Sequence, residues 1–398
     1  MSDGTCFRVP GFLGNGVSAG IKDTGKKDLS LIYSTVPAKA AGVFTTNAFK
    51  AAPVLVDMER IRGGKARAVV TNSGNANAAT GREGYENALR MGKEAARHLG
   101  VGEDSVLVAS TGVIGQPLPI GKIVSAMGGL VAGLKADGLL DAEEAIMTTD
   151  RYPKMALRTC VAGGREITLC GLAKGAGMIE PRMATLLSYI LTDADLDESA
   201  MNRLFRAALD RSFNAISVDG CMSTNDTVLF LANGVAGNGT LRSGAPGYGR
   251  FRDALFQVME ELAKSIVRDG EGATKVLDIR VEGAGSRKQA RSFAYAVARS
   301  NLVKAAFFGK DPNWGRIVSA VGSLGIPVDP DRVDVFIEDI PIFTGGAGTS
   351  ADETRLQEAM ALPEIRVSIR LGAGKAAFRV FASDLTHDYV SINAHYRT

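Results

Sequence analysis

A glycine-rich segment that leads directly into an apolar stretch is the feature that most constrains the fold of this chain. Residues 174–185 read Lys-Gly-Ala-Gly-Met-Ile-Glu-Pro-Arg-Met-Ala-Thr, and residues 186–191 read Leu-Leu-Ser-Tyr-Ile-Leu. Glycine permits backbone conformations that other residues avoid, whereas a short, largely apolar run between turn signals is typical of a buried strand. Thr185 therefore stands between a flexible loop and a strand, where a hydroxyl is available for chemistry.

The hydroxyl of Thr185 becomes a nucleophile only if a base removes its proton. Attack of this hydroxyl on the carbonyl carbon of Ala184, followed by hydrolysis of the ester, would cut the chain and give Thr185 a free α-amine. An α-amine has a reference pKa of about 7.7 to 8.0, so it can act as the base near neutral pH. The local sequence also fits a β-branched residue that merely opens a strand.

Histidine and cysteine offer little alternative chemistry. None of the three histidines lies beside a Gly-x-Ser-x-Gly motif, which argues against a Ser-His-Asp triad; they are His98, His387 and His395. The four cysteines are widely separated, which is typical of reduced thiols; they are Cys6, Cys160, Cys170 and Cys221. Without a Cys-x-x-Cys motif or clustered histidines, the sequence predicts no metal site.

Size and charge indicate a globular protein without the charge pattern of a nucleic-acid binder. The 398 residues are 45% hydrophobic, enough for two ordinary domains. The net charge of +3 is small and the charged residues are interspersed, which argues against a nucleic-acid partner. No apolar run approaches the ~20 residues of a membrane span, and the first residues do not resemble a secretory signal, so we expect a cytoplasmic protein.

Hydrophobic periodicity predicts a mixture of strands and helices. Short β-rich runs predict strands at residues 68–71, 106–109 and 228–231. Apolar residues at helical spacing predict helices at residues 85–99, 198–211 and 253–267. Residues 391–398 alternate in the manner of a strand, and we expect this end of the chain to dock and to place Asn393, Thr398 and the terminal carboxylate in a site.

Several loops carry candidate functional groups. Residues 72–78 and 110–115 are turns of small polar residues after predicted strands, and the second could hold an oxyanion, although an ordinary turn fits as well. Lys174 invites a phosphate-loop interpretation, but the complete motif is not present. Residues 269–275 place two carboxylates at the C-terminal end of a helix, where a cationic ligand group would balance them; a solvated turn is the alternative.

Taken together, these segments resemble the ornithine acetyltransferase family, the glutamate N-acetyltransferases of arginine biosynthesis, over nearly the whole chain. The matching motifs lie at residues 41–47, 72–78, 110–115, 148–150, 174–185, 223–227, 269–275, 311–316 and 393–398. The resemblance implies an α+β fold of layered helix-sheet-sheet-helix type with a smaller C-terminal domain. Glu180, Arg182 and Cys221-Met222 differ from the pattern expected for the family, so substrate preference and cleavage rate stay open.

The resemblance also implies site residues. The chain would cleave itself between Ala184 and Thr185 into an α chain, residues 1–184, and a β chain, residues 185–398, which stay together as an α2β2 heterotetramer. Thr185 would be the nucleophile, and Thr111 and Gly112 would form the oxyanion hole. The implied substrate-binding residues are Thr148, Lys174, Thr185, Glu271, Asn393 and Thr398.

The implied reaction is ping-pong acetyl transfer from N2-acetylornithine to glutamate through an acetyl-Thr185 intermediate. Acetyl-CoA is an alternative acetyl donor in bifunctional members, and no resident cofactor is implied. Three other functions stay open: an N-terminal-nucleophile aminopeptidase or amidohydrolase of related architecture, a specialised acetyltransferase of secondary metabolism, and an amino-acid-binding protein that never matures.

Overall fold

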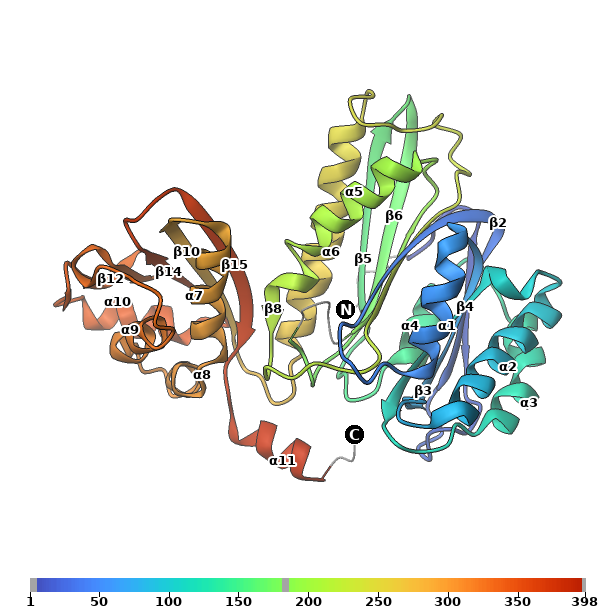
Figure 1. Cartoon of the computed structure of the whole chain (residues 1–398), viewed down its shortest axis with the longest axis horizontal. Helices are drawn as coiled ribbons and strands as arrows, with labels where there is room; N and C mark the ends of the chain where they lie inside the picture. The colour runs from blue at the N-terminus through green and yellow to red at the C-terminus, as the bar shows by residue number, and fades with distance from the viewer. Residues whose placement is uncertain (1–5, 181–185, 396–398) are drawn as a thin grey trace.

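The computed structural model describes residues 6–180 and 186–395 of the chain. Within these ranges the strands form two sheets, one of eight strands and one of seven. Figure 1 shows a larger unit built on the first sheet and a smaller unit that carries most of the second. The helices and strands of both units together make an α+β protein, as the sequence predicts.

The first sheet has the strand order β4-β3-β2-β9-β7-β6-β5, with β1 paired to β2 beside this path. Its strands are β1 (Phe12–Val17), β2 (Leu29–Phe44), β3 (Lys65–Asn75), β4 (Val106–Val113), β5 (Lys154–Ala162), β6 (Arg165–Lys174), β7 (Leu187–Thr192) and β9 (Thr227–Ala232). The three strands predicted from the sequence lie within β3, β4 and β9, because each is an apolar run that the fold buries.

The long strand β2 turns this single sheet into two layers. Its first half pairs with β1 and β3, its second half pairs with β9, and the register with β3 shifts between Tyr33 and Ala38. β3 and β7 are not neighbours in the sheet, yet the hydroxyls of Thr71 and Tyr189 lie 2.7 Å apart in the buried interior. The sheet therefore folds over on itself, with apolar side chains of both halves between the layers.

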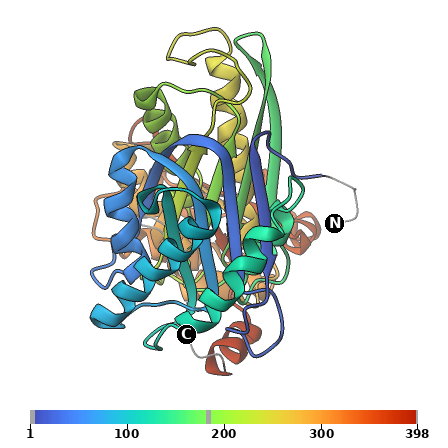
Figure 2. The same cartoon turned by 90° about the vertical axis from the view of Figure 1, so that its right-hand side faces the viewer.

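Helices cover the two outer faces of this folded sheet (Figure 2). On the β3-β4 side lie α1 (Ala52–Arg60), α2 (Gly81–Leu99) and α3 (Ile120–Ala132), and on the β5-β6-β7 side lie α5 (Glu198–Leu209) and α6 (Tyr248–Arg268). A further helix, α4 (Leu139–Ile146), contributes apolar side chains to the space between the layers. This arrangement confirms the predicted helix-sheet-sheet-helix layering.

The smaller unit is built on the second sheet, with strand order β13-β12-β11-β14-β10-β15-β8. Its strands are β8 (Ile216–Ser217), β10 (Val276–Ala284), β11 (Asp334–Ile337), β12 (Ile340–Thr344), β13 (Ala347–Gly348), β14 (Glu364–Arg370) and β15 (Ala376–Ser383). Its helices are α7 (Arg287–Arg299), α8 (Asn301–Phe308), α9 (Trp314–Gly322) and α10 (Glu353–Ala361). The short strand β8 comes from the larger unit's stretch of sequence and pairs with β15, so the two units share a sheet.

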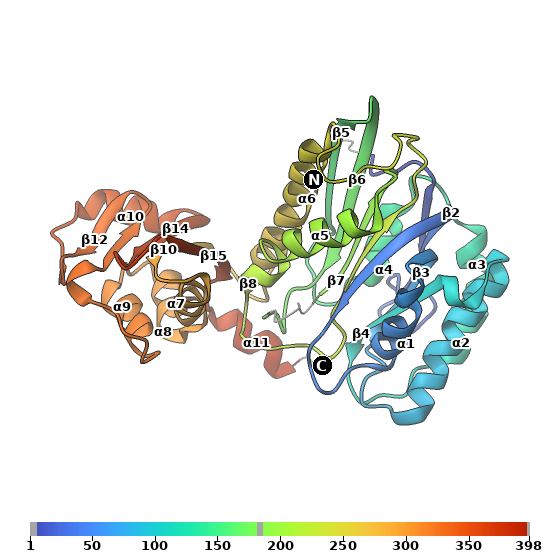
Figure 3. The same ribbon diagram turned by 45° about the horizontal axis from the view of Figure 1, so that its top comes forward.

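The last described element is a helix, α11 (His387–His395), which leaves the smaller unit and runs toward the larger one (Figure 3). The predicted strand at residues 391–398 is therefore wrong for residues 391–395. Ser391 Oγ donates to the carbonyl of His387 at 3.2 Å and Asn393 Nδ2 to that of Tyr389 at 3.0 Å, one helical turn earlier in each case. Such a short alternating run does not exclude a helix, and here these local bonds accompany one.

The three predicted helices are confirmed with shifted ends. They correspond to α2, α5 and α6, which begin or end up to five residues from the predicted bounds. Gly100 ends α2 in a left-handed conformation, and the Asp197 side chain caps α5 by accepting from Ala200 N. Among the described residues, no helix combines the length and apolar character that a membrane span requires.

The predicted pieces 1–184 and 185–398 interleave in the first sheet. β7 and β9 belong to the second piece and lie between β2 and β6, which belong to the first. Six residue pairs join β2 to β9, and six join β6 to β7. Neither piece alone could complete this sheet, because each would leave unpaired strand edges.

Candidate functional site

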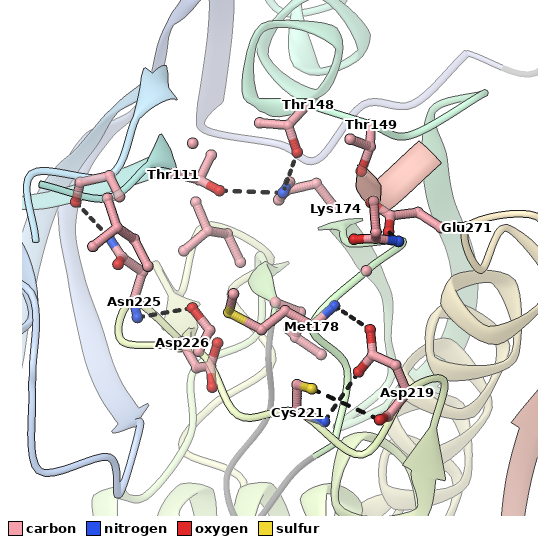
Figure 4. A pocket seen from close by; sticks show the side chains of 18 of the residues that line it. Thr111, Thr148, Thr149, Lys174, Met178, Asp219, Cys221, Asn225, Asp226 and Glu271 are labelled. Atoms are coloured by element: carbon pink, nitrogen blue, oxygen red, sulfur yellow. Dashed lines mark hydrogen bonds between the residues drawn. The ribbon is translucent and has the colours of Figure 1, made fainter. Parts of the chain in front are cut away.

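A cavity of about 140 Å³ lies where the end of β4, the end of β6, the start of β7 and helix α11 converge. Figure 4 shows this pocket and the side chains around it. The sequence-predicted site residues found in its lining are Thr111, Gly112, Thr148, Lys174, Glu271 and Asn393. Segments that are more than 250 residues apart in the sequence thus meet at one site.

The predicted oxyanion residues Thr111 and Gly112 lie at the end of β4. The turns predicted at residues 72–78 and 110–115 begin inside β3 and β4, and because these strands are parallel neighbours the two polar segments lie side by side. Gly112 has a φ of +133°, and a Cβ there would lie 2.3 Å from the carbonyl carbon of Gly74. Only glycine fits this close approach of the two strands.

Lys174 connects the two predicted threonines. Its Nζ donates to Thr148 Oγ1 at 2.7 Å and to Thr111 Oγ1 at 3.2 Å (Figure 4). Because a lysine ammonium can only donate, both hydroxyls accept here, and their own hydrogens remain available to other acceptors. Burial lowers the pKa of Lys174, and the Asp150 carboxylate opposes that shift.

Glu271 supplies a carboxylate to the cavity lining. It follows the end of α6, and Asn393 Nδ2 of α11 donates to its Oε2 at 2.8 Å. A Cβ at Gly177 would lie 2.3 Å from the same oxygen, so the glycine-rich loop lies directly against Glu271. The expectation that the end of the chain reaches the site thus holds for Asn393.

The expectation that a ligand cation balances both carboxylates of residues 269–275 is wrong for Asp269. This side chain is buried and forms ion pairs with Lys154 Nζ at 2.6 Å and Arg151 Nε at 2.9 Å. The protein supplies its own cations there, because a carboxylate at the C-terminal end of a helix gains nothing from the helix dipole. Of the two, only Glu271 lines the cavity.

Sequence reasoning assigned no role to Asp226, which also lines the cavity. Burial raises the pKa of this carboxyl well above its usual range, and its Oδ2 has no hydrogen-bond partner in the part of the chain that the structure describes. The run of small polar residues at 223–227 was a signal, since such a run seldom fills a core. Its neighbour Asn225 ties two strand-end turns together, donating to the carbonyls of Ala76 at 2.6 Å and Ser110 at 2.8 Å.

The loop that carries the expected cleavage site is anchored at its beginning. Asp219 accepts from the backbone N–H groups of Met178 at 2.6 Å and Ile179 at 2.9 Å. Glu180, one of the departures from the family pattern, is buried and forms an ion pair with Arg299 of α7. Cys221, another departure, lines the cavity.

Three predicted residues, Ala184, Thr185 and Thr398, lie outside the described residues, as does Arg182. Leu186 is the first described residue after Thr185, and it is buried in the cavity wall. Its carbonyl accepts from Thr227 N at 3.0 Å, which fixes the chain at the entrance to β7.

Comparison with known proteins places this chain in one family. The ArgJ family matches residues 14–398. The arginine biosynthesis bifunctional protein ArgJ of Geobacter sulfurreducens is 51% identical, covering 98% of this chain and 100% of its own length. The protein of the same name from Symbiobacterium thermophilum is 47% identical, covering 98% of this chain and 97% of its own length.

A solved structure supports the same family assignment. The crystal structure of arginine biosynthesis bifunctional protein argJ from Bacillus halodurans is 37% identical and covers 52% of this chain and 98% of that chain, with a TM-score of 0.51. The family and the enzyme class predicted from the motifs are thereby confirmed. The chain belongs to the ArgJ family.

Proposed function

We propose that this enzyme transfers an acetyl group from N2-acetylornithine to glutamate through an ester on Thr185, after cleaving itself between Ala184 and Thr185. The observation that carries the proposal is the cavity itself. Threonine hydroxyls held by a buried lysine lie on one side and a carboxylate on the other, and the residue after Thr185 is in the wall. These are the groups that acyl transfer to and from an amino acid requires.

The α-amine released by cleavage would serve as the general base. No histidine is among the described residues that line the cavity, so no side chain of the usual kind is available for this role. The amine takes the hydroxyl proton as Thr185 attacks the acetyl carbonyl carbon, and it returns a proton to the ornithine nitrogen as the amide bond breaks. Attack of the glutamate amine on the acetyl ester then restores the threonine hydroxyl.

Thr111 and Gly112 would stabilise the developing oxyanion. The Thr111 hydroxyl accepts from Lys174, so its hydrogen can point to a substrate oxygen, and the Lys174 ammonium adds positive charge nearby. Glu271 suits the ammonium group of ornithine or glutamate, since a carboxylate and an ammonium form a charge-assisted hydrogen bond. Thr148, Asn393 and Thr398 would complete the substrate site.

Two observations support the cleavage. The Bacillus halodurans chain is covered to 98% by 52% of this chain, about 207 residues, which is close to the 214 residues that follow Ala184 in this chain of 398. The two pieces of this chain would also stay together after a cut, because β7 and β9 are paired between β6 and β2.

The remaining properties follow from the same proposal. We expect assembly as an α2β2 heterotetramer in the cytoplasm and acetyl-CoA as a second acetyl donor for glutamate. The enzyme would need no resident cofactor, because the acetyl group is carried by Thr185 itself. It would act on small molecules and on neither nucleic acid nor membranes.

One incubation separates transfer from hydrolysis. Purified enzyme is mixed with N2-acetylornithine, with and without glutamate, and both acetate and N-acetylglutamate are measured. N-acetylglutamate formation supports the proposal, whereas acetate release at the same rate without glutamate identifies an amidohydrolase. Intact mass of the same sample reveals whether the 41.8 kDa chain has been cut.

A further inference from the structure

Three buried charged side chains lie behind the cavity wall without lining it: Asp150, Lys154 and Asp269, called here the buried triad. Lys154 Nζ lies 2.7 Å from Asp150 Oδ1 and 2.6 Å from Asp269 Oδ2, and the side chains of all three are fully buried. Burying three charges is costly unless they are paired and hydrogen-bonded. Lys154 is paired with both carboxylates here, and the contacts of Asp150 and Asp269 show which parts of the cavity they hold.

Asp150 contacts both segments that present the lysine and threonine of the cavity. Its Oδ1 accepts from Gly175 N at 2.6 Å, directly after Lys174, and its Oδ2 accepts from Thr148 N at 2.9 Å. Its Oδ2 also lies 3.9 Å from Lys174 Nζ. A single carboxylate thus fixes the backbone on both sides of the Lys174–Thr148 hydrogen bond.

Asp269 extends the same arrangement to the opposite wall. It ends α6, two residues before Glu271, and it accepts from Arg151 N at 3.0 Å as well as from Lys154. Glu271 N in turn donates to the carbonyl of Ala176 at 2.9 Å, in the glycine-rich loop that follows Lys174. Lys154 therefore links, through two carboxylates, the segments that carry Lys174 and Glu271.

We propose that the buried triad is a positioning device for the acyl-transfer site, in which Asp150 holds Lys174 in place as an ammonium and Asp269 sets the position of Glu271. The inference rests on the function proposed above. None of the three residues contacts the reacting atoms; they act through Lys174 and Glu271.

The charges around Lys174 give this role a measurable signature. Burial lowers the pKa of Lys174; Asp150 opposes the shift most strongly, Lys154 adds to it, and Glu271 and Asp226 also oppose it. Lys22 is a further cation close enough to interact with Lys174. Removing the Asp150 charge therefore lowers the pKa of Lys174 further, so the ammonium is lost at a lower pH.

The experiment compares full-length wild-type enzyme with Asp150→Asn, measuring kcat for N-acetylglutamate formation against pH. The alkaline limb of the wild-type profile reports loss of the Lys174 proton. In Asp150→Asn we expect this limb to move to lower pH by roughly one unit or more, the usual effect of an opposite charge at this distance. Arg151→Ala is the matched control, because it removes a half-exposed ion pair to Asp269 without changing the charges nearest Lys174. An unchanged alkaline limb in Asp150→Asn, or the same shift in Arg151→Ala, would overturn the proposal.

A second variant covers the case in which Asp150→Asn does not fold. Asp150→Asn/Lys154→Met removes one negative and one positive charge and leaves Asp269 paired with Arg151. We expect a smaller shift in the same direction, since loss of the Lys154 charge offsets part of the effect. No shift in this variant would contradict the proposal.

A readout without catalysis separates this proposal from the proposed function. Lysine-selective NMR titration follows the Lys174 ammonium directly, with Lys174→Arg used to assign its signal. If wild type makes no N-acetylglutamate, the proposed function fails, and the titration still decides whether Asp150 holds the Lys174 proton. Equal Lys174 titration in wild type and Asp150→Asn would refute the role of the triad.

Discussion

The two walls of the cavity differ in how firmly their side chains are held. The wall formed by the folded sheet carries Thr111 and Lys174 on strand ends that are joined by a hydrogen bond and held from behind by Asp150. The wall formed by α11 has no buried residue in its helix, and among the described residues Asn393 of this helix donates a hydrogen bond to Glu271. From this difference we infer that Thr111 and Lys174 are held in place before a substrate binds, whereas the wall formed by α11 can adjust.

The largest expected effect is that of replacing Thr185, the proposed nucleophile that precedes Leu186 in the cavity wall. Thr185→Ala should abolish both self-cleavage and acetyl transfer, because it removes the nucleophile of each reaction. Intact mass and N-acetylglutamate formation measure the two losses. Thr185→Ser is the control and should still be cut, since it keeps a hydroxyl; transfer that survives in Thr185→Ala would remove this residue from the mechanism.

Thr111→Ala tests the wall that is formed by the folded sheet. We expect kcat to fall by roughly 100-fold or more with little change in KM, as for loss of one preorganised oxyanion donor. Steady-state kinetics with N2-acetylornithine separates the two constants. Thr111→Ser keeps the hydroxyl that accepts from Lys174 and should retain most of the activity, whereas an unchanged kcat in the alanine variant would rule out an oxyanion role for this side chain.

Glu271→Gln tests the charge of the opposite wall. Loss of a charge-assisted hydrogen bond to the substrate ammonium should raise KM by roughly 10- to 100-fold and change kcat less. The measurement is the KM for N2-acetylornithine and for glutamate. Glu282→Gln, an exposed carboxylate on β10, is the matched control. A loss confined to kcat would show that Glu271 acts on the chemistry and not on binding.

Asn393→Ala should have the smallest effect and sharpens the comparison most. Its amide donates to the Glu271 carboxylate and to the carbonyl of Tyr389. Because Glu271 itself keeps its charge in this variant, KM should rise by only about 2- to 10-fold. The same KM measurements apply. An effect as large as that of Glu271→Gln would mean that α11 is as firmly held as the sheet wall.

The sequence predicted the layers of the fold and those site residues that lie in recognisable local patterns. Apolar runs located β3, β4 and β9, and the small polar residues at the end of β4 indicated an oxyanion site at Thr111. The role of Lys174 came from the family resemblance, because the local phosphate-loop motif is incomplete. For Glu271 and Asn393 the local pattern indicated only a pair of carboxylates after a helix and a docked chain end, and their roles in substrate binding came from the family resemblance. Their meeting in space depends on α11 returning across the molecule, which no local pattern encodes.

The features that the sequence did not predict depend on contacts between residues that are far apart in the chain. Lys154 was not predicted, because its partner Asp269 lies 115 residues later and nothing near either residue signals a buried ion pair. The same distance explains the error over Asp269, which looked free to bind a ligand. Residues 391–395 were misassigned because a few alternating residues do not distinguish a strand from a short helix at the end of a chain.

The interleaving of β7 and β9 with β2 and β6 changes the thermodynamics of a chain that has been cut. Before the cut, folding is unimolecular; afterwards, two separate polypeptides must associate to rebuild the sheet, so recovery from denaturant becomes dependent on protein concentration. If the chain is cut as proposed, maturation would be a one-way step, in which catalytic competence is gained and easy renaturation is lost.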